Sequence, residues 1–284
     1  MKFYIIIPAH NEEKTIGTTI NSLVNQTILP KKLVVVNDNS VDNTGTIVSS
    51  YCKRYKWIKK INSTSSSEHL PGSKIINAFY KGYEALDEDY DIICKFDADL
   101  AFNSNYLEKI EKHFKSNHKL GLVGGVCVIK KEQTWVPEGR ARGDHIRGAL
   151  KAYRKECFVE IGKIKKSIGW DTIDEFLAQY YSWKILTDTS LKVKHLRATG
   201  HGYSPGAEQL QGVATYRTRL GIILTLIVAI KAAIKAKRFL LIKRFLSGYF
   251  MAKTKKLSFL VDKDQGKFIR AKRWGGILKR LFLI

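Results

Sequence analysis

Three short polar segments each follow an apolar run, and their residue types could carry chemistry. They are Pro8-Ala9-His10-Asn11-Glu12-Glu13 after residues 3–7, Asn37-Asp38-Asn39-Ser40-Val41-Asp42-Asn43-Thr44 after residues 33–36, and Asp97-Ala98-Asp99 after residues 91–96. Short, continuous apolar runs are typical of buried strands in parallel sheets. Ligands of such sheets bind outside the carboxyl ends of the strands, so we expect the three segments to converge on one cleft.

The acid pair Asp97 and Asp99 could bind a metal ion. Residues i and i+2 of an extended segment point the same way, which places two carboxylates on one target. Neighbouring carboxylates repel each other and so favour a bound cation, and oxygen ligands suit Mg²⁺ or Mn²⁺. Such an ion usually takes further ligands from phosphates, which predicts a diphosphate in the cleft. Taken singly, this spacing is common and Asp38 could be a simple turn former; the three segments in this order are the specific signal.

Strands and helices alternate along the part of the chain that must position these segments. Apolar patterns predict helices at 12–25, 42–55, 75–86, 104–115, 147–162 and 172–184, further strands at 57–61, 120–129 and 191–196, and loops at 62–73 and 130–145. This alternation predicts an α/β fold with a mostly parallel sheet flanked by helices. The composition changes near residue 208. We therefore expect a catalytic domain at 1–208, with a nucleotide-binding half at about 1–100 and an acceptor half at about 101–208, and a basic helical extension at 209–284.

Three stretches resemble the family-2 glycosyltransferases of the GT-A fold: IIIPAHNEEKTIGTTINSLVNQT, VVVNDNSVDNT and FDADL. The resemblance covers about residues 1–200 and is most specific in the first 100. It implies that Glu12 and Asp38 contact the base of a nucleotide, while Asp97 contacts the ribose and Asp99 holds a metal-bound diphosphate. The implied sugar-nucleotide ligands are Pro8, His10, Asn11, Glu12, Asp38, Gly72, Asn77 and Asp97. The serine-rich segment 62–73 departs from the glycine- and arginine-containing version usual in the family.

The resemblance also implies a general base. Inverting members of the family use an acid after the second half of the sheet, and Gly169-Trp170-Asp171-Thr172-Ile173-Asp174-Glu175 lies at that point. Counting back from Trp183 places Asp171 at the base position, with Asp174 as the alternative. Asp171 could also be the N-cap of the following helix, which does not exclude catalysis. His195 could supply a further metal or diphosphate contact, or be structural. Four basic residues of the loop at 130–145 and just after it could bind phosphate or the acceptor, or could simply be solvated. They are Arg140, Arg142, His145 and Arg147.

Positive charge is concentrated at the C-terminus. The net charge is +23, and residues 217–284 contain 18 lysine and arginine residues against two acidic ones, a net charge of +16. The longest apolar run, 220–230, would form a helix of about 16 Å, too short for a hydrocarbon core of about 30 Å. The spacing of Ile230, Ile234, Leu241 and Phe245 predicts one helix face bordered by basic residues, which suits an anionic membrane surface. Alternatively, these helices pack on the catalytic domain or pair in a dimer.

Together with these patterns, the resemblance implies an inverting glycosyltransferase that uses Mg²⁺ or Mn²⁺. Its donor would be a UDP- or GDP-linked sugar, and its acceptor a hydroxyl of a glycan or lipid-linked molecule in cell-envelope polysaccharide or glycolipid synthesis. The four cysteines have no metal-binding spacing and are expected to be free thiols, and Met1 leads directly into a strand-like run, so we expect the cytoplasm as the compartment. With the basic C-terminus, this predicts a peripheral position on the cytoplasmic face of the membrane.

Three alternatives remain open from the sequence. A polyprenyl-phosphate sugar synthase has an acceptor that is already an anion and needs no strong base. A nucleic-acid-binding protein would explain the basic C-terminus, but the basic residues are interleaved with aliphatic ones, so we expect no nucleic-acid partner. A catalytically inactive sugar-nucleotide sensor fits poorly with an intact acid pair and an available base.

Overall fold

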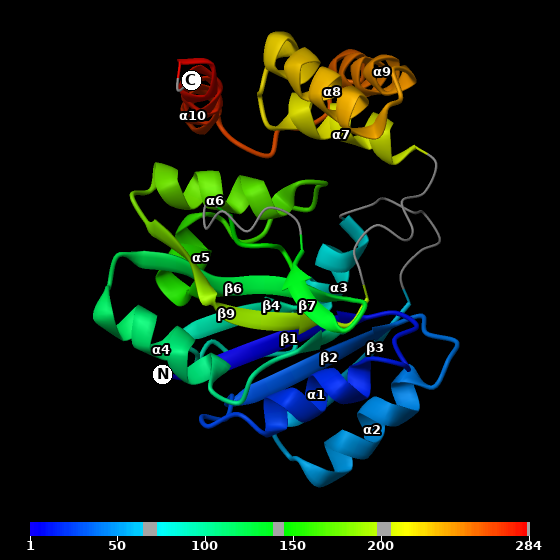
Figure 1. Cartoon of the computed structure of the whole chain (residues 1–284), viewed down its shortest axis with the longest axis vertical. Helices are drawn as coiled ribbons and strands as arrows, with labels where there is room; N and C mark the ends of the chain where they lie inside the picture. Colours follow the sequence, from blue (N-terminus) through cyan, green and yellow to red (C-terminus); the bar gives the residue numbers. More distant parts are fainter. Residues whose placement is uncertain (65–72, 139–144, 198–205, 283–284) are drawn as a thin grey trace.

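The computed structural model describes residues 1–64, 73–138, 145–197 and 206–282 (Figure 1). The strands are β1 Phe3–Ala9, β2 Lys32–Asp38, β3 Ile58–Ser63, β4 Ile92–Phe96, β5 Leu100–Ala101, β6 Leu120–Lys131, β7 Thr134–Pro137, β8 Leu150–Arg154 and β9 Lys184–His195. The helices are α1 Ile16–Val24, α2 Thr44–Arg54, α3 Ser73–Glu84, α4 Tyr106–Ser116, α5 Lys155–Glu160, α6 Trp170–Tyr180, α7 Ala207–Arg217, α8 Ile222–Ala236, α9 Leu240–Thr254 and α10 Lys263–Phe282.

A single mixed sheet forms the centre of the molecule. Its strand order is β3-β2-β1-β4-β8-β6-β9-β5, and β7 pairs with the far part of β6. The first four strands are parallel, and β1 and β4 are buried along their whole length. Helices cover both faces of the sheet, as Figure 1 shows. The predicted α/β class with flanking helices is confirmed.

The second half of the sheet differs from the prediction of a mostly parallel arrangement. Strand β8 runs antiparallel to both β4 and β6, in a region where the sequence pattern predicted a helix from 147 to 162. All five residues of β8 are buried, including Lys151. A lysine in a central strand reads as a surface position, so the pattern favoured an amphipathic helix. Only the short helix α5 follows, at Lys155–Glu160.

Helices α7, α8 and α9 pack against one another at the end of the molecule farthest from α2 (Figure 1). At the crossing of α7 and α9 the two backbones touch: a Cβ on Gly212 would lie 1.8 Å from the carbonyl oxygen of Phe245, and one on Gly248 would lie 1.9 Å from that of Gln209. Only glycine allows this approach, so these two positions fix how α7 and α9 cross. Among the described residues, no helix is both long and apolar enough to cross a membrane.

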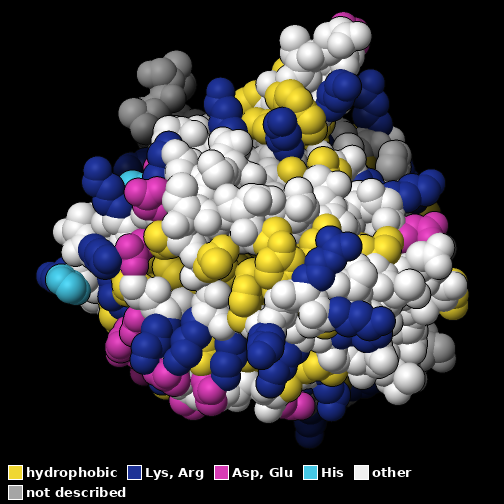
Figure 2. All heavy atoms as spheres, turned by 90° about the horizontal axis from the view of Figure 1, so that it is seen from below, with side chains coloured by type: hydrophobic (Ala, Val, Ile, Leu, Met, Phe, Trp, Pro, Cys, Tyr) yellow, Lys and Arg dark blue, Asp and Glu magenta, His cyan; other side chains and the backbone are white. Residues whose placement is uncertain are grey.

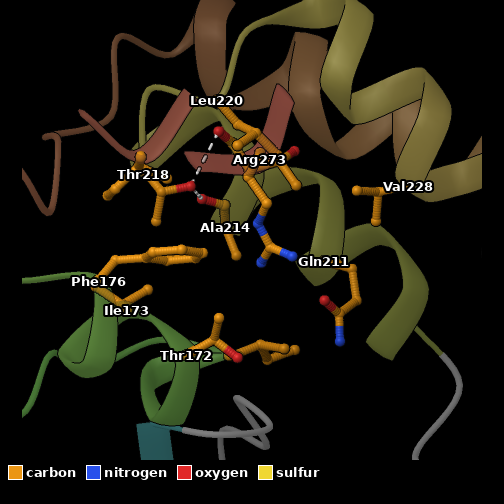
Figure 3. A pocket seen from close by; sticks show the side chains of 13 residues that line it. Thr172, Ile173, Phe176, Gln211, Ala214, Thr218, Leu220, Val228 and Arg273 are labelled. Carbon is orange, nitrogen blue, oxygen red and sulfur yellow. Dashed lines mark hydrogen bonds between the residues drawn. The ribbon is translucent and has the colours of Figure 1, made fainter. Parts of the chain in front are cut away.

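The C-terminal helices also contact α6, the helix that carries Asp171. Between α6, α7, α8 and α10 lies a cavity of about 170 Å³. Figure 3 shows Arg273 of α10 reaching into it between Phe176 of α6 and Gln211 of α7. The Arg273 guanidinium lies 4.9 Å from the centre of the Phe176 ring, a cation–π distance. The C-terminal region is therefore packed on the part of the chain predicted to bind the acceptor.

One expectation about the C-terminal helices is wrong. Ile230, Ile234, Leu241 and Phe245 do not share a helix face, because α8 ends at Ala236 and the next residue, Lys237, has a left-handed backbone with φ of 53°. Leu241 and Phe245 of α9 are buried, whereas Ile230 and Ile234 of α8 are exposed. The exposed apolar side chains of α8 instead form their own stripe, which is described below.

Candidate functional site

The turns after β1 and β2 are tied directly to each other. The backbone N–H of Asn11 donates to Ser40 Oγ at 3.0 Å, and the side-chain Oδ1 of Asn11 accepts from the N–H of Val41 at 2.9 Å. Asn11 adopts a left-handed backbone, with φ of 54°, which asparagine tolerates better than most residues. His10 Nδ1 donates to the backbone oxygen of Asp38 at 2.6 Å. These bonds fix the two turns as one unit.

A cavity of about 320 Å³ opens beside this unit. It is lined by Pro8, Ala9, His10, Glu12, Asp38, Lys74, Ile75 and Ala78. The structure thus brings four of the predicted nucleotide ligands, Pro8, His10, Glu12 and Asp38, to one cavity. Asn77 is exposed on α3 and is not part of this lining. Gly72 lies outside the described residues.

The carboxylate of Asp99 lies in the middle of a charged group. Asp99 is only 5% exposed, and among the described residues its Oδ1 has no hydrogen-bond partner. His195 Nε2 lies 3.4 Å from Oδ1, and Arg197 Nε lies 3.4 Å from Oδ2. Arg197 also pairs with Glu12 through its NH2 group. Arg197 therefore joins the acid pair after β4 to the turn after β1.

His195 is held from its other nitrogen by Glu138. The distance from His195 Nδ1 to Glu138 Oε2 is 2.6 Å, and the guanidinium of Arg147 lies 3.0 Å from the same oxygen. Burial on its own would lower the pKa of His195, but the carboxylates of Asp99 and Glu138 outweigh it and raise this pKa. A Cys127 ligand atom is also within 4.8 Å of those of Glu138 and His195.

These atoms fit a divalent cation. A buried carboxylate oxygen without a hydrogen bond is costly unless a ligand satisfies it. Asp99 Oδ1 is such an atom, and it faces the Nε2 atom of His195. A histidine that donates its other N–H to a carboxylate is the usual arrangement of a metal-binding imidazole. Asp99 and His195 are thus the residues that could hold a metal, which would take the place of the proton on His195 Nε2, with Glu138 orienting the ring.

The second candidate group lies at the start of α6. Asp171 is about one third exposed, and its Oδ2 lies 3.5 Å from His145 Nε2. His145 Nδ1 lies 3.0 Å from Glu175 Oε2, and Glu175 Oε1 accepts from the backbone N–H of Ile146 at 2.9 Å. Burial would raise the pKa of Asp171, but the hydrogen bond with His145 and the nearby lysines outweigh burial and lower it. Asp171 is therefore held ionised at neutral pH.

Asp174 has a different environment. It is completely buried, and its oxygens are bonded to Lys151 Nζ at 2.7 Å and to the hydroxyl of Tyr153. Burial raises the pKa of Asp174, with Glu175 adding to the effect. A carboxylate with both oxygens bonded inside the core has no access to a substrate.

Two buried lysines contact both the Asp97–Asp99 pair and the carboxylates at the start of α6. Lys95 of β4 and Lys151 of β8 are directly opposite each other in the sheet, and their Nζ atoms lie 5.3 and 5.8 Å from the centre of the Trp170 ring. Like charges opposite each other destabilise a sheet unless they are compensated. Lys95 pairs with Asp97, and Lys151 pairs with Asp174 and Glu175 and donates to the backbone oxygen of Asp171. The acid pair and the start of α6 are thus linked through one charge cluster.

The sequence predicted most of these positions but missed several of their partners. Lys95, Lys151, Glu138 and Glu175 were not among the predicted site residues. The two lysines carried a signal, because each lies inside an otherwise apolar segment, where a charge must be compensated. Glu138 carried none, since only the pairing of β7 with β6 brings it near the Asp99 group.

Sequence relatives of this chain are glycosyltransferases. The sequence profile "Glycosyl transferase family 2" matches residues 4–165, more than half of the chain. The probable glycosyltransferase YdaM of Bacillus subtilis is 36% identical over 101 residues, covering 34% of this chain and 23% of that protein. The poly-β-1,6-N-acetyl-D-glucosamine synthase of Staphylococcus aureus is 26% identical over 224 residues, covering 70% of this chain and 47% of that protein. The chain spans less than two thirds of the length of these relatives.

Solved structures show the same fold. S. aureus TarS in complex with UDP-GlcNAc has a TM-score of 0.57 at 18% identity, covering 98% of this chain and 81% of that chain. GalNAc-T7 with UDP, GalNAc and Mn²⁺ has a TM-score of 0.57 at 15% identity, covering 74% and 46%. The sheet order, the covering helices and these similarities agree with the GT-A fold. By its sequence profile, this chain belongs to glycosyltransferase family 2.

Proposed function

We propose that the chain transfers a sugar from a nucleoside-diphosphate sugar to an acceptor hydroxyl, with inversion at the anomeric carbon. The observation that carries this proposal is the buried Oδ1 of Asp99, which has no hydrogen-bond partner in the part of the chain that the structure describes, faces His195 and lies near the cavity lined by Glu12 and Asp38. A relative that makes poly-β-1,6-N-acetyl-D-glucosamine supports a role in cell-envelope polysaccharide or glycolipid synthesis. The UDP-containing neighbours favour a UDP-linked donor over a GDP-linked one.

In this proposal, each group has a distinct task. The cavity beside β1 and β2 binds the nucleoside, with Asp38 and Glu12 oriented by the cross-linked turns. Asp99 and His195 would hold a Mg²⁺ or Mn²⁺ ion, which when bound would supply positive charge to the diphosphate leaving group. Asp171 takes the proton of the acceptor hydroxyl. We assign this role to Asp171 instead of Asp174, because a base must reach the proton that it abstracts and Asp174 is sealed in the core.

Nucleotide binding gives the first test. With UDP and Mn²⁺ at about 100 times the dissociation constant, the folded state should gain about 2.7 kcal/mol. For a protein of this size, that corresponds to a rise in Tm of roughly 5–10 °C. The measurement is a thermal-shift series with UDP, GDP and UMP, each with Mn²⁺ and with EDTA. Rises of equal size for UMP and UDP, or in EDTA, would count against metal-assisted diphosphate binding.

We also propose that α8 contacts an anionic membrane surface. Ile223, Leu226, Ile230 and Ile234 are exposed at helical spacing, and Ile223 and Ile234 are each 63% exposed. Lys231 and Lys235 border this stripe and are exposed. At the opposite end of the molecule, Figure 2 shows acidic side chains intermingled with the basic ones. Residues 217–284, which include α8, carry a net charge of +16, so the excess positive charge and the apolar stripe are in the same part of the chain, as an interfacial helix requires.

Vesicle flotation tests the membrane contact. The full chain should float with vesicles of phosphatidylcholine and phosphatidylglycerol, and a chain with Ile223→Glu and Ile234→Glu should not, because glutamate opposes both insertion and the anionic surface. Val159→Glu is the matched control, since Val159 is also exposed but lies on α5. Equal flotation of all three proteins would remove α8 from the proposal. Binding that persists at high salt would show that insertion outweighs charge.

A further inference from the structure

His145 lies between two carboxylates of α6. Its Nδ1 lies 3.0 Å from Glu175 Oε2, and its Nε2 lies 3.5 Å from Asp171 Oδ2. Glu175 is fixed independently, because its Oε1 accepts from the N–H of Ile146 at 2.9 Å and from Lys151 at 3.1 Å. His145 therefore extends a rigid chain of contacts from the buried core to the partly exposed carboxylate of Asp171.

This bridge requires a particular protonation state. A neutral imidazole has one N–H donor and one lone pair, whereas the imidazolium ion has two donors. Ionised carboxylates are acceptors only. A neutral His145 could thus donate to Glu175 or to Asp171 but not to both, and its lone pair would face the other carboxylate. Only the cation satisfies both contacts.

The contact leaves one oxygen of Asp171 available. Oδ2 lies 3.5 Å from His145 Nε2, and the side chain of Asp171 is about one third exposed, which leaves Oδ1 open to an acceptor. The remaining charged groups near Asp171 are Lys151 of β8 and Lys95 of β4, both buried beneath the first turn of α6. Their side chains act from the interior, so His145 is the partner that orients the carboxylate from its exposed side.

We propose that His145, as an imidazolium held by Glu175, is a positioning residue that fixes the carboxylate of Asp171 for proton abstraction. This inference rests on the proposed role of Asp171 as the base. It assigns the loop residue His145 to the acceptor side of the site, in place of a solvated position or a phosphate clamp.

The charge balance around His145 makes this state persist at physiological pH. Burial would lower the pKa of His145 and Lys151 repels its charge, but hydrogen bonds to Asp171 and Glu175 outweigh both and raise the pKa to about 9. A histidine in the unfolded chain titrates near pH ~6.5. The bridge therefore contributes its full stability below that pH and loses it as the pH rises through about 9.

The pH dependence of kcat tests the proposal through three variants assayed with saturating donor and Mg²⁺. The wild-type kcat should fall as the pH rises through about 9. His145→Gln should lower kcat at neutral pH on the order of tenfold, because a misplaced base reacts more slowly, and should lack the fall near pH 9. His145→Lys retains a cation, so it should restore part of the rate and move the fall toward the lysine pKa of about 10.4. The donor KM should not change in either variant.

His113→Gln is the matched control, because His113 also bonds a carboxylate, Asp188, at 2.7 Å, but at the C-terminal end of α4. It should behave as wild type. A His145→Gln enzyme with an unchanged kcat and an unchanged alkaline limb would overturn the proposal. So would a His145→Lys enzyme no better than His145→Gln.

A titration that needs no activity separates this inference from the proposed function. In NMR spectra of ¹³C-labelled histidine, the His145 signal, identified by its loss in His145→Gln, should titrate near pH 9 and shift to lower pH in Asp171→Asn. An unshifted midpoint in Asp171→Asn means that no bridge forms, whatever the reaction. A shifted midpoint with an active Asp171→Asn enzyme means that the bridge exists but that Asp171 is not the base.

Discussion

Asp99→Asn is expected to lower kcat/KM for sugar transfer on the order of 10³-fold while leaving the fold intact. The substitution keeps the shape of the side chain but removes the negative charge that a cation needs. A metal at a developing leaving group contributes several kcal/mol of transition-state stabilisation, so loss of this ligand should affect the chemical step most. His195 keeps its bond to Glu138, and Arg197 keeps its pair with Glu12. Circular dichroism and Tm should therefore be close to wild type.

The matched control for this variant is Asp188→Asn. Asp188 also pairs with a histidine, His113, but outside the candidate site. It should retain wild-type activity. Mn²⁺ binding measured by electron paramagnetic resonance should weaken in Asp99→Asn and stay unchanged in the control. If Asp99→Asn turned over at the wild-type rate in excess chelator, the metal assignment would be wrong.

Asp171→Asn is expected to lower kcat by about 10²–10⁴-fold, the range of general-base contributions. Asparagine has nearly the same size and can still accept a hydrogen bond from His145, but it cannot take a proton at neutral pH. The contact from Lys151 to residue 171 uses the backbone oxygen, so it survives the substitution. Binding of the nucleoside diphosphate should barely change, because the cavity lined by Glu12 and Asp38 lies at another part of the sheet edge.

Asp174→Asn should show the opposite behaviour. Removing one charge of the fully buried pair with Lys151 leaves the lysine with Glu175 as its remaining close carboxylate, and breaking buried pairs costs about 3–5 kcal/mol of folding free energy. Its main effect should appear in Tm, with kcat affected less. If Asp174→Asn were stable but inactive while Asp171→Asn stayed active, Asp174 would be the base and Asp171 would have a structural role. Full activity of both variants would favour an acceptor that is already ionised, such as a polyprenyl phosphate.

The half of the site that contains the proposed nucleotide ligands could be predicted from local sequence, and the surroundings of the proposed base could not. The segments after β1, β2 and β4 are short and follow apolar strands of a parallel sheet, so strand periodicity alone brings them to one edge. The surroundings of Asp171 depend on β8, where the sequence pattern predicted a helix because Lys151 did not read as a core residue. His145, Glu138 and Glu175 meet their partners only through contacts between segments that are distant along the chain.

In the C-terminal region, too, some features could be predicted from the sequence and others could not. Its basic charge and its helices follow from composition and periodicity, but the break between α8 and α9 at Lys237 depends on a single left-handed backbone position. Neither lysine nor the residues around it mark such a position, as glycine would. The predicted apolar face therefore combined residues of two helices. Its second half, Leu241 and Phe245, is buried where α9 packs against its neighbours.

The facing lysines of β4 and β8 have a consequence for how this site can evolve. The Nζ atoms of Lys95 and Lys151 both lie over the ring of Trp170, and Lys95 pairs with the partly exposed Asp97 while Lys151 pairs with the fully buried Asp174. Replacing Lys151 with an apolar residue leaves the carboxylate of Asp174 buried without the lysine that pairs with it, and replacing Asp97 first leaves the buried Lys95 without its carboxylate partner. Each single step passes through a destabilised protein, whereas the paired change does not. Each lysine and its carboxylate partner should therefore co-vary among homologous chains. A homologue that has lost one member of a pair should have lost the other as well.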